Sequence, residues 1–464
     1  MPGSTAYTTA ATHYWSNVPA EATPACIFKP ASADQLSVFL LITRLTQSEF
    51  AVKSGGHAAF AGASSTSTGI TVSMENFNQV TLSQDRKTAA VGPGNTWESV
   101  YDALDPYNLT VIGGRASDVG VGGLMLGGGI SFFSSLYGWA CDNVVSYQMV
   151  TACGTTVTAS ATQNQDLFYA LRGGGNNFGI VTKFNLAVFS LPGGAIWGGT
   201  RIYQEQHMPA TINAFTQMAN NIEKDPSAGS WLTFVNYGGF KVSAAELWHV
   251  GQNGSNATIF SNYSAIPSIS DDTQNRNLSG YTEKVEAPDP YGFRQYFYTM
   301  TVKNDANLTT AAKDIFFEES DLSSVPGSLI VMTMQSITVP QLQQMSKNGG
   351  NPLGLSAADG PLTLVLIACR WNNAADDATA YAAGSNTLTR IKDQSMAMGL
   401  DVNYVYMNYG AQYQDIVASY GDANKQKLIN IAQRYDPTGV FQTLSPGFFK
   451  LDRAPVPGTE YFSH

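Results

Sequence analysis

The chain has 464 residues, which is enough for two domains with sizeable cores. It is 44% hydrophobic and only 13% charged, and it contains 44 glycines, a composition typical of a compact, loop-rich protein and not of a disordered one. Its net charge of -10 comes without a basic stripe, which excludes the usual classes of nucleic-acid-binding protein. The longest apolar stretch, residues 36–42, is too short to cross a membrane.

The cysteine spacing indicates whether a metal site is expected, and the Asn-x-Ser/Thr sequons indicate the cellular compartment. Cys26, Cys141, Cys153 and Cys369 follow no metal-binding spacing, so we predict no metal site and at most one or two disulfides. Six Asn-x-Ser/Thr sequons occur, five of them within residues 253–307, and they favour a secreted glycoprotein. The N-terminus lacks a signal-peptide pattern, so the chain reads as a mature secreted form or as a protein that stays in the cell.

Short helices and strands alternate through the first 190 residues. A capping box of Ser32 and Gln35 begins a helix that runs to about residue 45. The side chains that we expect on its buried face are apolar: Leu36, Phe39, Leu40 and Leu45. Further strands and helices are expected at residues 26–28, 50–52, 69–72, 88–91, 96–104, 144–159, 164–171 and 180–189. No long parallel repeat is present, so the pattern indicates an α+β fold and not a doubly wound sheet.

A second domain is predicted after a boundary at residues 191–194. Its strands are expected at residues 197–203, 231–236, 242–249 and 363–369, and its helices at residues 209–223 and from about 370 to 398. Residues 1–20, which are polar and aromatic, are expected to lie over the surface, and loops are expected at the polar residues 251–290 and the glycine-rich residues 341–360. No Gly-x-Gly-x-x-Gly sequence follows a strand and opens a helix, which argues against a nicotinamide-dinucleotide site.

Four glycine-dense loops carry the functional signal. They lie at residues 52–57, 113–129, 137–144 and 171–181. The first is a strand end followed by Gly55, Gly56 and His57. Glycines let the backbone press against a ligand with its amide hydrogens outward, which suits an anion such as a pyrophosphate.

In this order and at these intervals, the four loops resemble the FAD-binding domain of the vanillyl-alcohol oxidase and p-cresol methylhydroxylase family, and more narrowly its berberine-bridge-enzyme-like branch. The resemblance implies a two-subdomain FAD-binding domain, whose first part is residues 1–193. A substrate domain with an antiparallel sheet covered by helices would follow at residues 194–412. Residues 413–464 would return to the FAD-binding domain, since residues 435–442 resemble the family's C-terminal segment.

The resemblance also implies which residues hold FAD. His57 would carry it covalently through the 8α methyl group of the flavin. Some relatives add a second link through a cysteine before the Val-Gly-Gly of the second loop, where this chain has Gly120, so we predict a single link and expect Cys141 only to pack. The other expected FAD contacts lie in the glycine loops, their flanks and one later segment: Lys53, Ser54, Gly55, Gly56, Ser64, Gly114, Asp118, Val119, Gly120, Gly122, Gly123, Gly127, Asn143, Val144, Gly175, Gly179, Ile180, Val181 and Asn408.

A tyrosine-rich segment, residues 404–409, resembles the stretch that faces the substrate side of the flavin in this family. By that resemblance Asn408 touches the cofactor and Tyr409 acts as the catalytic base. A tyrosine with an ordinary pKa of about 10 is a poor base at neutral pH, so the site would have to lower that pKa. Relatives often have an acidic residue two positions later, where this chain has Ala411. Arg115 is expected to be structural.

The predicted function is that of an FAD-linked oxidase of a small organic, secondary-metabolite-like substrate. Hydride from an alcohol or an activated C–H bond would pass to the flavin, and O2 would reoxidise it to give hydrogen peroxide. An oligosaccharide oxidase that produces a lactone is one alternative, and a flavin-carrying cyclase without net redox turnover is another. We expect a monomer with no nucleic-acid or membrane partner.

Overall fold

The computed structural model describes residues 2–456 and contains three sheets. The smallest has three parallel strands in the order β1 (Cys26–Phe28), β3 (Ile70–Ser73) and β2 (Phe50–Lys53). The second is antiparallel and comprises β4 (Val80–Leu82), β5 (Thr88–Val91), β9 (Ile180–Ser190), β7 (Val144–Val150) and β8 (Thr156–Ser160), with β6 (Leu109–Val111) paired to β9. The helices of this half are α1 (Thr5–Thr12), α2 (Asn17–Ala20), α3 (Ala33–Thr46), α4 (Trp97–Leu104), α5 (Val121–Leu126), α6 (Ser134–Tyr137) and α7 (Gln165–Ala170).

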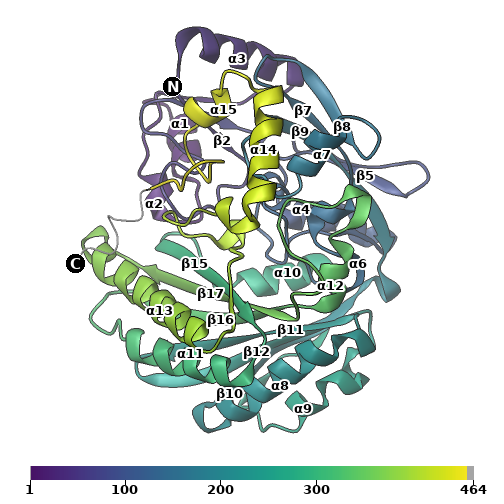
Figure 1. The fold of residues 1–464 in the computed structure, drawn as a ribbon, viewed down its shortest axis with the longest axis vertical. Coiled ribbons are helices and arrows are strands. Elements are labelled where there is room, and N and C mark those ends of the chain that lie inside the picture. Colours follow the sequence, from purple (N-terminus) through teal and green to yellow (C-terminus); the bar gives the residue numbers. More distant parts are fainter. Residues whose placement is uncertain (1, 457–464) are drawn as a thin grey trace.

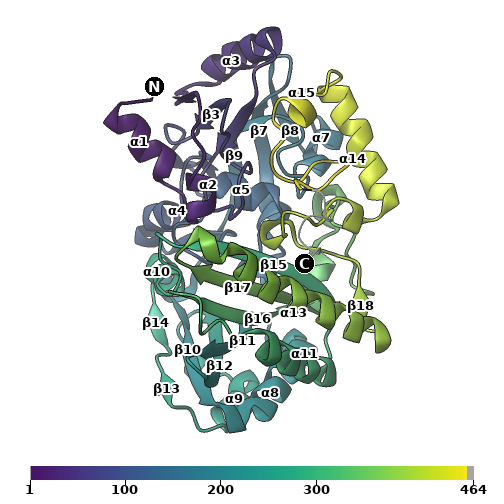
Figure 2. The ribbon, with the colours of Figure 1, turned by 90° about the vertical axis from the view of Figure 1, so that its left-hand side faces the viewer.

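The third sheet is antiparallel, has nine strands and fills the other half of the molecule (Figure 1). Along the sheet its strands are β13 (Ser270–Asp271), β10 (Ile196–Gln204), β12 (Phe240–Val250), β11 (Ala228–Tyr237), β16 (Leu329–Ile337), β17 (Leu362–Trp371), β15 (Arg294–Lys303) and β18 (Asp401–Val402), with β14 (Gln274–Arg276) also paired to β10. Helices α8 (Met208–Asn221), α11 (Ala306–Glu319) and α13 (Asp377–Ala397) cover one face (Figure 2). The shorter helices are α9 (Ser261–Ser264), α10 (Leu278–Glu286) and α12 (Val339–Gln344). The α+β fold class is therefore confirmed.

The C-terminal segment lies against the first half of the chain, where it appears in yellow beside α3 and α7 (Figure 1). Helices α14 (Asp422–Tyr435) and α15 (Val440–Thr443) form this segment. Asp166 of α7 accepts hydrogen bonds from Arg434 at 2.8 Å and from the Tyr435 hydroxyl at 2.9 Å. The Phe50 amide donates to the carbonyl of Leu444. The boundaries at residues 193 and 412 stay a prediction.

The expectation that residues 1–20 run over the surface is only partly right, because most of residues 2–13 are exposed but residues 14–16 are buried. The segment forms α1 and α2, and Trp15 between them is only 1% exposed. Its backbone amide donates to the carbonyl of Gly56, and its indole donates to the carbonyl of Asp289. A polar N-terminal segment is therefore held down by a few buried side chains whose partners lie far along the chain.

Two further expectations need correction. Leu45 is 86% exposed, because the buried stripe of α3 follows helical spacing through Leu36, Phe39, Leu40 and Thr43 and leaves residue 45 on the outer side. Residues 251–290 are not a loop, since they contain α9, β13, β14 and α10. The short strands there pair through their backbones at the sheet edge, so they need no apolar alternation. Residues 341–344 are helical as part of α12, and the rest of the 341–360 stretch has only a 3-10 turn.

All four cysteines are free, with Cys141 and Cys369 buried, Cys26 half-buried and Cys153 exposed. Within residues 2–456, no helix is both long and apolar enough to span a bilayer.

A buried arginine joins the N-terminal segment to the nine-stranded sheet. Arg294, 7% exposed at the start of β15, donates two hydrogen bonds of 2.6 Å to Asp377 and a third to Glu21. We expect Arg294→Met to lower the free energy of unfolding by about 2–4 kcal/mol, because the carboxylate of Asp377 loses its bidentate partner. The measurement is the midpoint of urea unfolding.

The matched control is Arg390→Met. Arg390 is 42% exposed and pairs with Glu318 and Glu319 on the surface, where ion pairs add little. An equal loss of stability in the two variants would contradict the role given to Arg294.

Candidate active site

A cavity of about 670 Å³ lies between the glycine loops and the open face of the nine-stranded sheet. Its volume is in the range of ligand and cofactor pockets. One wall is built from the first two glycine loops, and the opposite wall from alternate residues of β10, β11, β12, β16 and β17. Because side chains alternate along a strand, the same strands bury their other residues beneath the covering helices.

The first two glycine loops are joined by a close approach of their backbones. A Cβ atom on Gly120 would lie 2.2 Å from the amide nitrogen of Gly55. The Ser54 hydroxyl donates to the Pro93 carbonyl at 2.5 Å and accepts from the Gly122 amide at 3.1 Å. By contrast, a Cβ on Gly123 would meet no atom within 4 Å, because this glycine faces the open cavity.

His57 follows the first loop and has a defined orientation. Its ring stacks on Trp15, with centroids 4.3 Å apart and planes 11° apart, and Phe297 lies 6.2 Å away. Its Nε2 atom is 3.6 Å from Asp118 Oδ1. Burial lowers the pKa of His57, and the negative charge of Asp118 opposes this only in part. The imidazole is therefore neutral at neutral pH and has a nucleophilic lone pair.

Tyr409 and Arg115 meet at a second point on the cavity wall. The Arg115 guanidinium donates to the Tyr409 hydroxyl at 2.9 Å and to Gln335 at 2.6 Å. It also lies over the ring of Trp231, 5.0 Å from the centroid. A cation is thus fixed beside the phenolic oxygen, where it is placed to stabilise negative charge. Arg115 therefore lines the cavity, and the expectation that it is structural stays a prediction.

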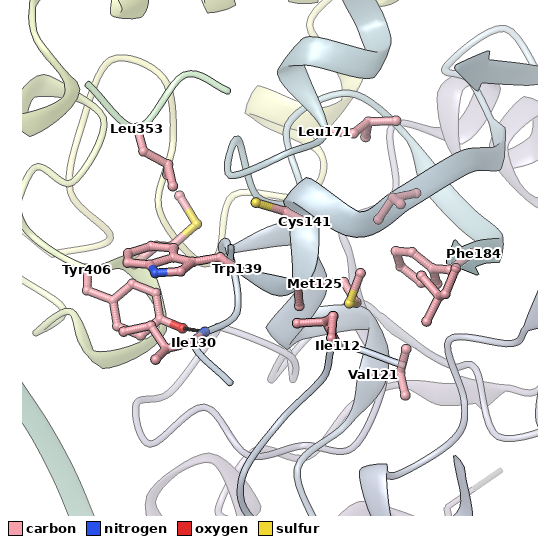
Figure 3. Packing of buried hydrophobic residues seen from close by; sticks show 14 of the residues in the cluster. Ile112, Val121, Met125, Ile130, Trp139, Cys141, Leu171, Phe184, Leu353 and Tyr406 are labelled. Atoms are coloured by element: carbon pink, nitrogen blue, oxygen red, sulfur yellow. Dashed lines mark hydrogen bonds between the residues drawn. The ribbon is translucent and has the colours of Figure 1, made fainter. Parts of the chain in front are cut away.

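Behind Tyr409, the rest of the tyrosine segment is anchored in the core. The buried hydroxyl of Tyr406 accepts from the Ile130 amide and from the Asn408 side chain, both at 3.0 Å. Figure 3 shows this hydroxyl pointing to Ile130 beside the indole of Trp139. Burial, with a smaller contribution from Tyr409, raises the pKa of Tyr406 well above its usual range. Tyr406 therefore stays neutral and serves as a fixed support.

The sheet side of the cavity is mostly apolar. Its central side chains come from five strands: Ile202, Val235, Ala244, Val331, Leu366 and Ala368. The hydroxyls of Thr233 and Thr333 pair with each other at 2.9 Å, so they offer little polarity. At one corner, Lys284 forms an ion pair of 2.6 Å with Glu246. This surface suits an apolar molecule better than a hydroxyl-rich one.

Most of the predicted site residues line this one cavity, and they are Ser54, Gly55, Gly56, His57, Ser64, Val119, Gly120, Gly122, Gly123, Gly175, Gly179, Ile180, Val181, Asn408 and Tyr409. The others lie outside its wall. The Lys53 side chain turns away and donates to the carbonyls of Ala10 and His13. Asp118 lies behind His57, and Gly114 packs on the ring of Trp97.

The remaining three predicted residues support the wall from within. Gly127 packs so closely on Asn408 that a Cβ atom would lie 2.0 Å from its side-chain oxygen. Asn143 is buried and donates to the carbonyls of Tyr137 and Trp139. Val144 is 1% exposed in the core. Their roles toward the cofactor stay predictions.

Several lining residues had no local signal in the sequence: Trp15, Trp231, Gln335, Glu246, Lys284 and Glu286. They come from strands, helix ends and the N-terminal segment, and only the tertiary fold brings them to the cavity. Cys141 is buried in the core near Trp139 and Met125 and does not line the cavity (Figure 3).

The residues around the cavity fit FAD. Gly123 and the neighbouring backbone leave open space where a Cβ atom would intrude. The buried hydroxyl of Ser64 lines the cavity and has no hydrogen-bond partner among residues 2–456. His57 presents a neutral imidazole at the edge of the same space.

Comparison with known proteins also indicates an FAD-binding protein. The family described as "FAD binding domain" matches residues 24–160. The FAD-dependent monooxygenase tpcD of Cochliobolus heterostrophus is 35% identical over 460 residues, covering 95% of this chain and 87% of that protein.

Two solved structures share the fold over nearly the whole chain. BBE-like 1 of Physcomitrella patens has a TM-score of 0.76 at 21% identity and covers 100% of this chain and 97% of the other. The glucooligosaccharide oxidase of Acremonium strictum, with its 6-S-cysteinyl, 8α-N1-histidyl FAD, has a TM-score of 0.76 at 20% identity and covers 96% and 94%.

Fold, cavity and relatives together define an FAD-dependent oxidoreductase. The chain belongs to the family of FAD-dependent oxidoreductases that includes tpcD, and it shares the fold of berberine-bridge-enzyme-like proteins. The resemblance predicted from the glycine loops is therefore confirmed.

Gly123 gives a direct test of where the cofactor lies. We expect Gly123→Ala to leave the unfolding free energy of cofactor-free protein unchanged or raised by up to ~1 kcal/mol, since alanine favours a helix and no atom is displaced. The FAD content of the purified protein, read from its absorbance, should fall several-fold because the new methyl group enters the cavity.

The comparison variant is Gly120→Ala, whose methyl group would collide with the backbone of Gly55 and should lower stability as well as FAD content. Full FAD content in Gly123→Ala would place the cofactor elsewhere.

Proposed function

We propose that this protein is an FAD-linked oxidase of an apolar small molecule, with the flavin attached once, at His57. The observation that carries the proposal is a single cavity that joins the His57 loop to an apolar sheet face, with Tyr409 and Arg115 on its wall. When bound, FAD serves as the acceptor of the hydride from the substrate. Everything else in the reaction falls to the side chains of the cavity.

In this proposal, Tyr409 takes the proton from the oxidised position of the substrate. Arg115 stabilises the negative charge on the phenolic oxygen through its hydrogen bond of 2.9 Å. Trp231 and Gln335 fix the guanidinium, so its direction does not depend on the substrate. The apolar strands hold the substrate and keep water from the reacting bond.

A single attachment fits the state of the cysteines. Cys369 lines the cavity, but burial raises the pKa of its thiol to about 12, so it is a poor nucleophile. Burial likewise raises the pKa of the Cys141 thiol well above its usual range. Neither thiolate is available at neutral pH for a second bond to the flavin.

Two other reactions are open to the same cofactor. Oligosaccharide oxidation is favoured by the related fold of the glucooligosaccharide oxidase and opposed by the apolar sheet face. Monooxygenation is favoured by the name of the 35% identical relative. Screening apolar alcohols and oligosaccharides for bleaching of the flavin without air, then for hydrogen peroxide or oxygen incorporation with air, separates the three. Product formation without bleaching would instead support a cyclase without net redox turnover.

We also propose that the protein is secreted and glycosylated at its Asn-x-Ser/Thr sequons. All six sequon asparagines are exposed: Asn108, Asn253, Asn256, Asn262, Asn277 and Asn307.

His57→Ala tests the attachment site. We expect flavin to stay in the pellet when the wild-type protein is precipitated with acid, and to be absent from the pellet of the variant, because only a covalent bond survives unfolding. His249→Ala is the control, since His249 pairs with Asp225 away from the cavity. Acid-stable flavin in His57→Ala would contradict attachment at this residue.

Tyr409→Phe tests the base. Removing the hydroxyl should slow anaerobic bleaching of the flavin by a substrate found in the screen by about 10²–10⁴-fold, the usual range for loss of general-base catalysis. Tyr404→Phe is the matched control from the same segment, because Tyr404 is buried and does not line the cavity. Equal rates in Tyr409→Phe and wild type would remove Tyr409 from the mechanism.

A further inference from the structure

Three side chains from distant segments form a cluster at the cavity wall: His57 and Glu286, which line the cavity, and Asp118 behind them. Each offers a polar atom, and these atoms all lie within 4.8 Å of one another. Glu286 ends α10, and Asp118 lies in the loop before α5. The short distances make the cluster a single electrostatic unit.

The cluster leaves four buried polar atoms without hydrogen bonds. They are His57 Nε2, both carboxylate oxygens of Asp118 and Glu286 Oε1, and none has a hydrogen-bond partner within the described residues 2–456. A buried polar group without a partner usually costs about 1–3 kcal/mol. Unpaired buried atoms lower the stability of the fold. Because these atoms surround His57, the cluster indicates a role in the chemistry of that residue.

The two acids do not both ionise. Burial, and then the negative charge of Asp118, raises the pKa of Glu286 well above its usual range. Glu286 therefore keeps its proton at neutral pH and adds no negative charge beside the imidazole.

We propose that Asp118, backed by Glu286, positions His57 for covalent attachment to the flavin and accepts its proton. This inference rests on the proposed link at His57. A carboxylate 3.6 Å from Nε2 favours the tautomer with the hydrogen on Nε2, which leaves the lone pair on Nδ1. Trp15 holds the plane of the ring by stacking, so Nδ1 keeps one direction.

The bond changes balance as follows. His57 Nδ1 forms a bond to the 8α carbon, and one C–H bond of that methyl group breaks. As Nδ1 becomes bonded, Asp118 accepts the Nε2 proton. The two electrons of the broken C–H bond pass through the flavin to O2, which takes up two protons, one from the methyl group and one from Nε2, and becomes hydrogen peroxide.

The test follows the rate of attachment in protein that already holds FAD without a covalent bond. Apoprotein is incubated with FAD in air, and acid-stable flavin is measured over time. We expect Asp118→Asn to attach flavin about 10–100-fold more slowly than wild type, by analogy with metal-binding histidines that lose the carboxylate that orients them. Glu286→Gln should change the rate less than two-fold, because glutamine matches a protonated glutamate.

Two further variants separate chemistry from loss of structure. Asp118→Glu restores the carboxylate and should recover part of the rate, and it decides the question if Asp118→Asn fails to retain FAD. Asp105→Asn is the control, since Asp105 holds the start of α10 through Ser279 without contact to His57 and should leave the rate unchanged.

The outcomes distinguish this inference from the proposed function. A wild-type rate in Asp118→Asn would overturn the role of Asp118 and leave the link at His57 intact. If Asp118→Asn loses FAD, a failure of FAD-loaded Asp118→Glu to form acid-stable flavin would overturn that role instead. An absence of acid-stable flavin in wild type would overturn both. An equal slowing in Asp105→Asn would show that the rate depends on the packing of α10 and not on the Asp118 carboxylate, and it would overturn the proposal.

Discussion

The site depends on the contact between two backbones at Gly55 and Gly120. A methyl group on Gly120 would lie 2.2 Å from the Gly55 nitrogen, so any side chain there would separate the loops. The hydrogen bonds of Ser54 to Pro93 and Gly122 hold the contact closed. It places the first loop, which carries His57, against the second loop, which carries Asp118. The close contact of these two backbones makes the cavity wall continuous, and it also brings the Asp118 carboxylate to His57.

The nine-stranded sheet completes the cavity because it is apolar beneath its covering helices and mostly apolar on the cavity face. Along β16, Val331 faces the cavity while Met332 packs beneath the covering helices. Neighbouring strands repeat the arrangement in register, with Val331 opposite Val235 on one side and Ala368 on the other. Strands buried on both faces read as continuous apolar runs without alternation. The cavity face is therefore a wide apolar surface that only the FAD-binding half of the chain covers.

The parts of the site that could be predicted from sequence are those with a local signal. Glycine loops and a tyrosine segment have recognisable patterns, and most of their residues line the cavity. Trp15 has no such pattern, because its indole reaches a carbonyl 274 residues away. Glu286 ends a helix in a stretch whose polar sequence indicates a loop. The strand pattern places Lys53 at the loop, but its side chain turns to the N-terminal segment. Tertiary contacts decide all three positions.

Two points on the cavity wall, both beside Phe297, have charged partners of opposite sign, and each suits the chemistry proposed there. At His57, bond formation on one nitrogen leaves positive charge on the imidazole, and Asp118 is 3.6 Å from the other nitrogen. At Tyr409, proton abstraction involves negative charge on the phenolic oxygen, and Arg115 is 2.9 Å away. An acidic residue two positions after Tyr409 would repel that negative charge unless it were itself protonated. This chain has the buried Ala411 there, so Arg115 acts on Tyr409 without a competing carboxylate at that position.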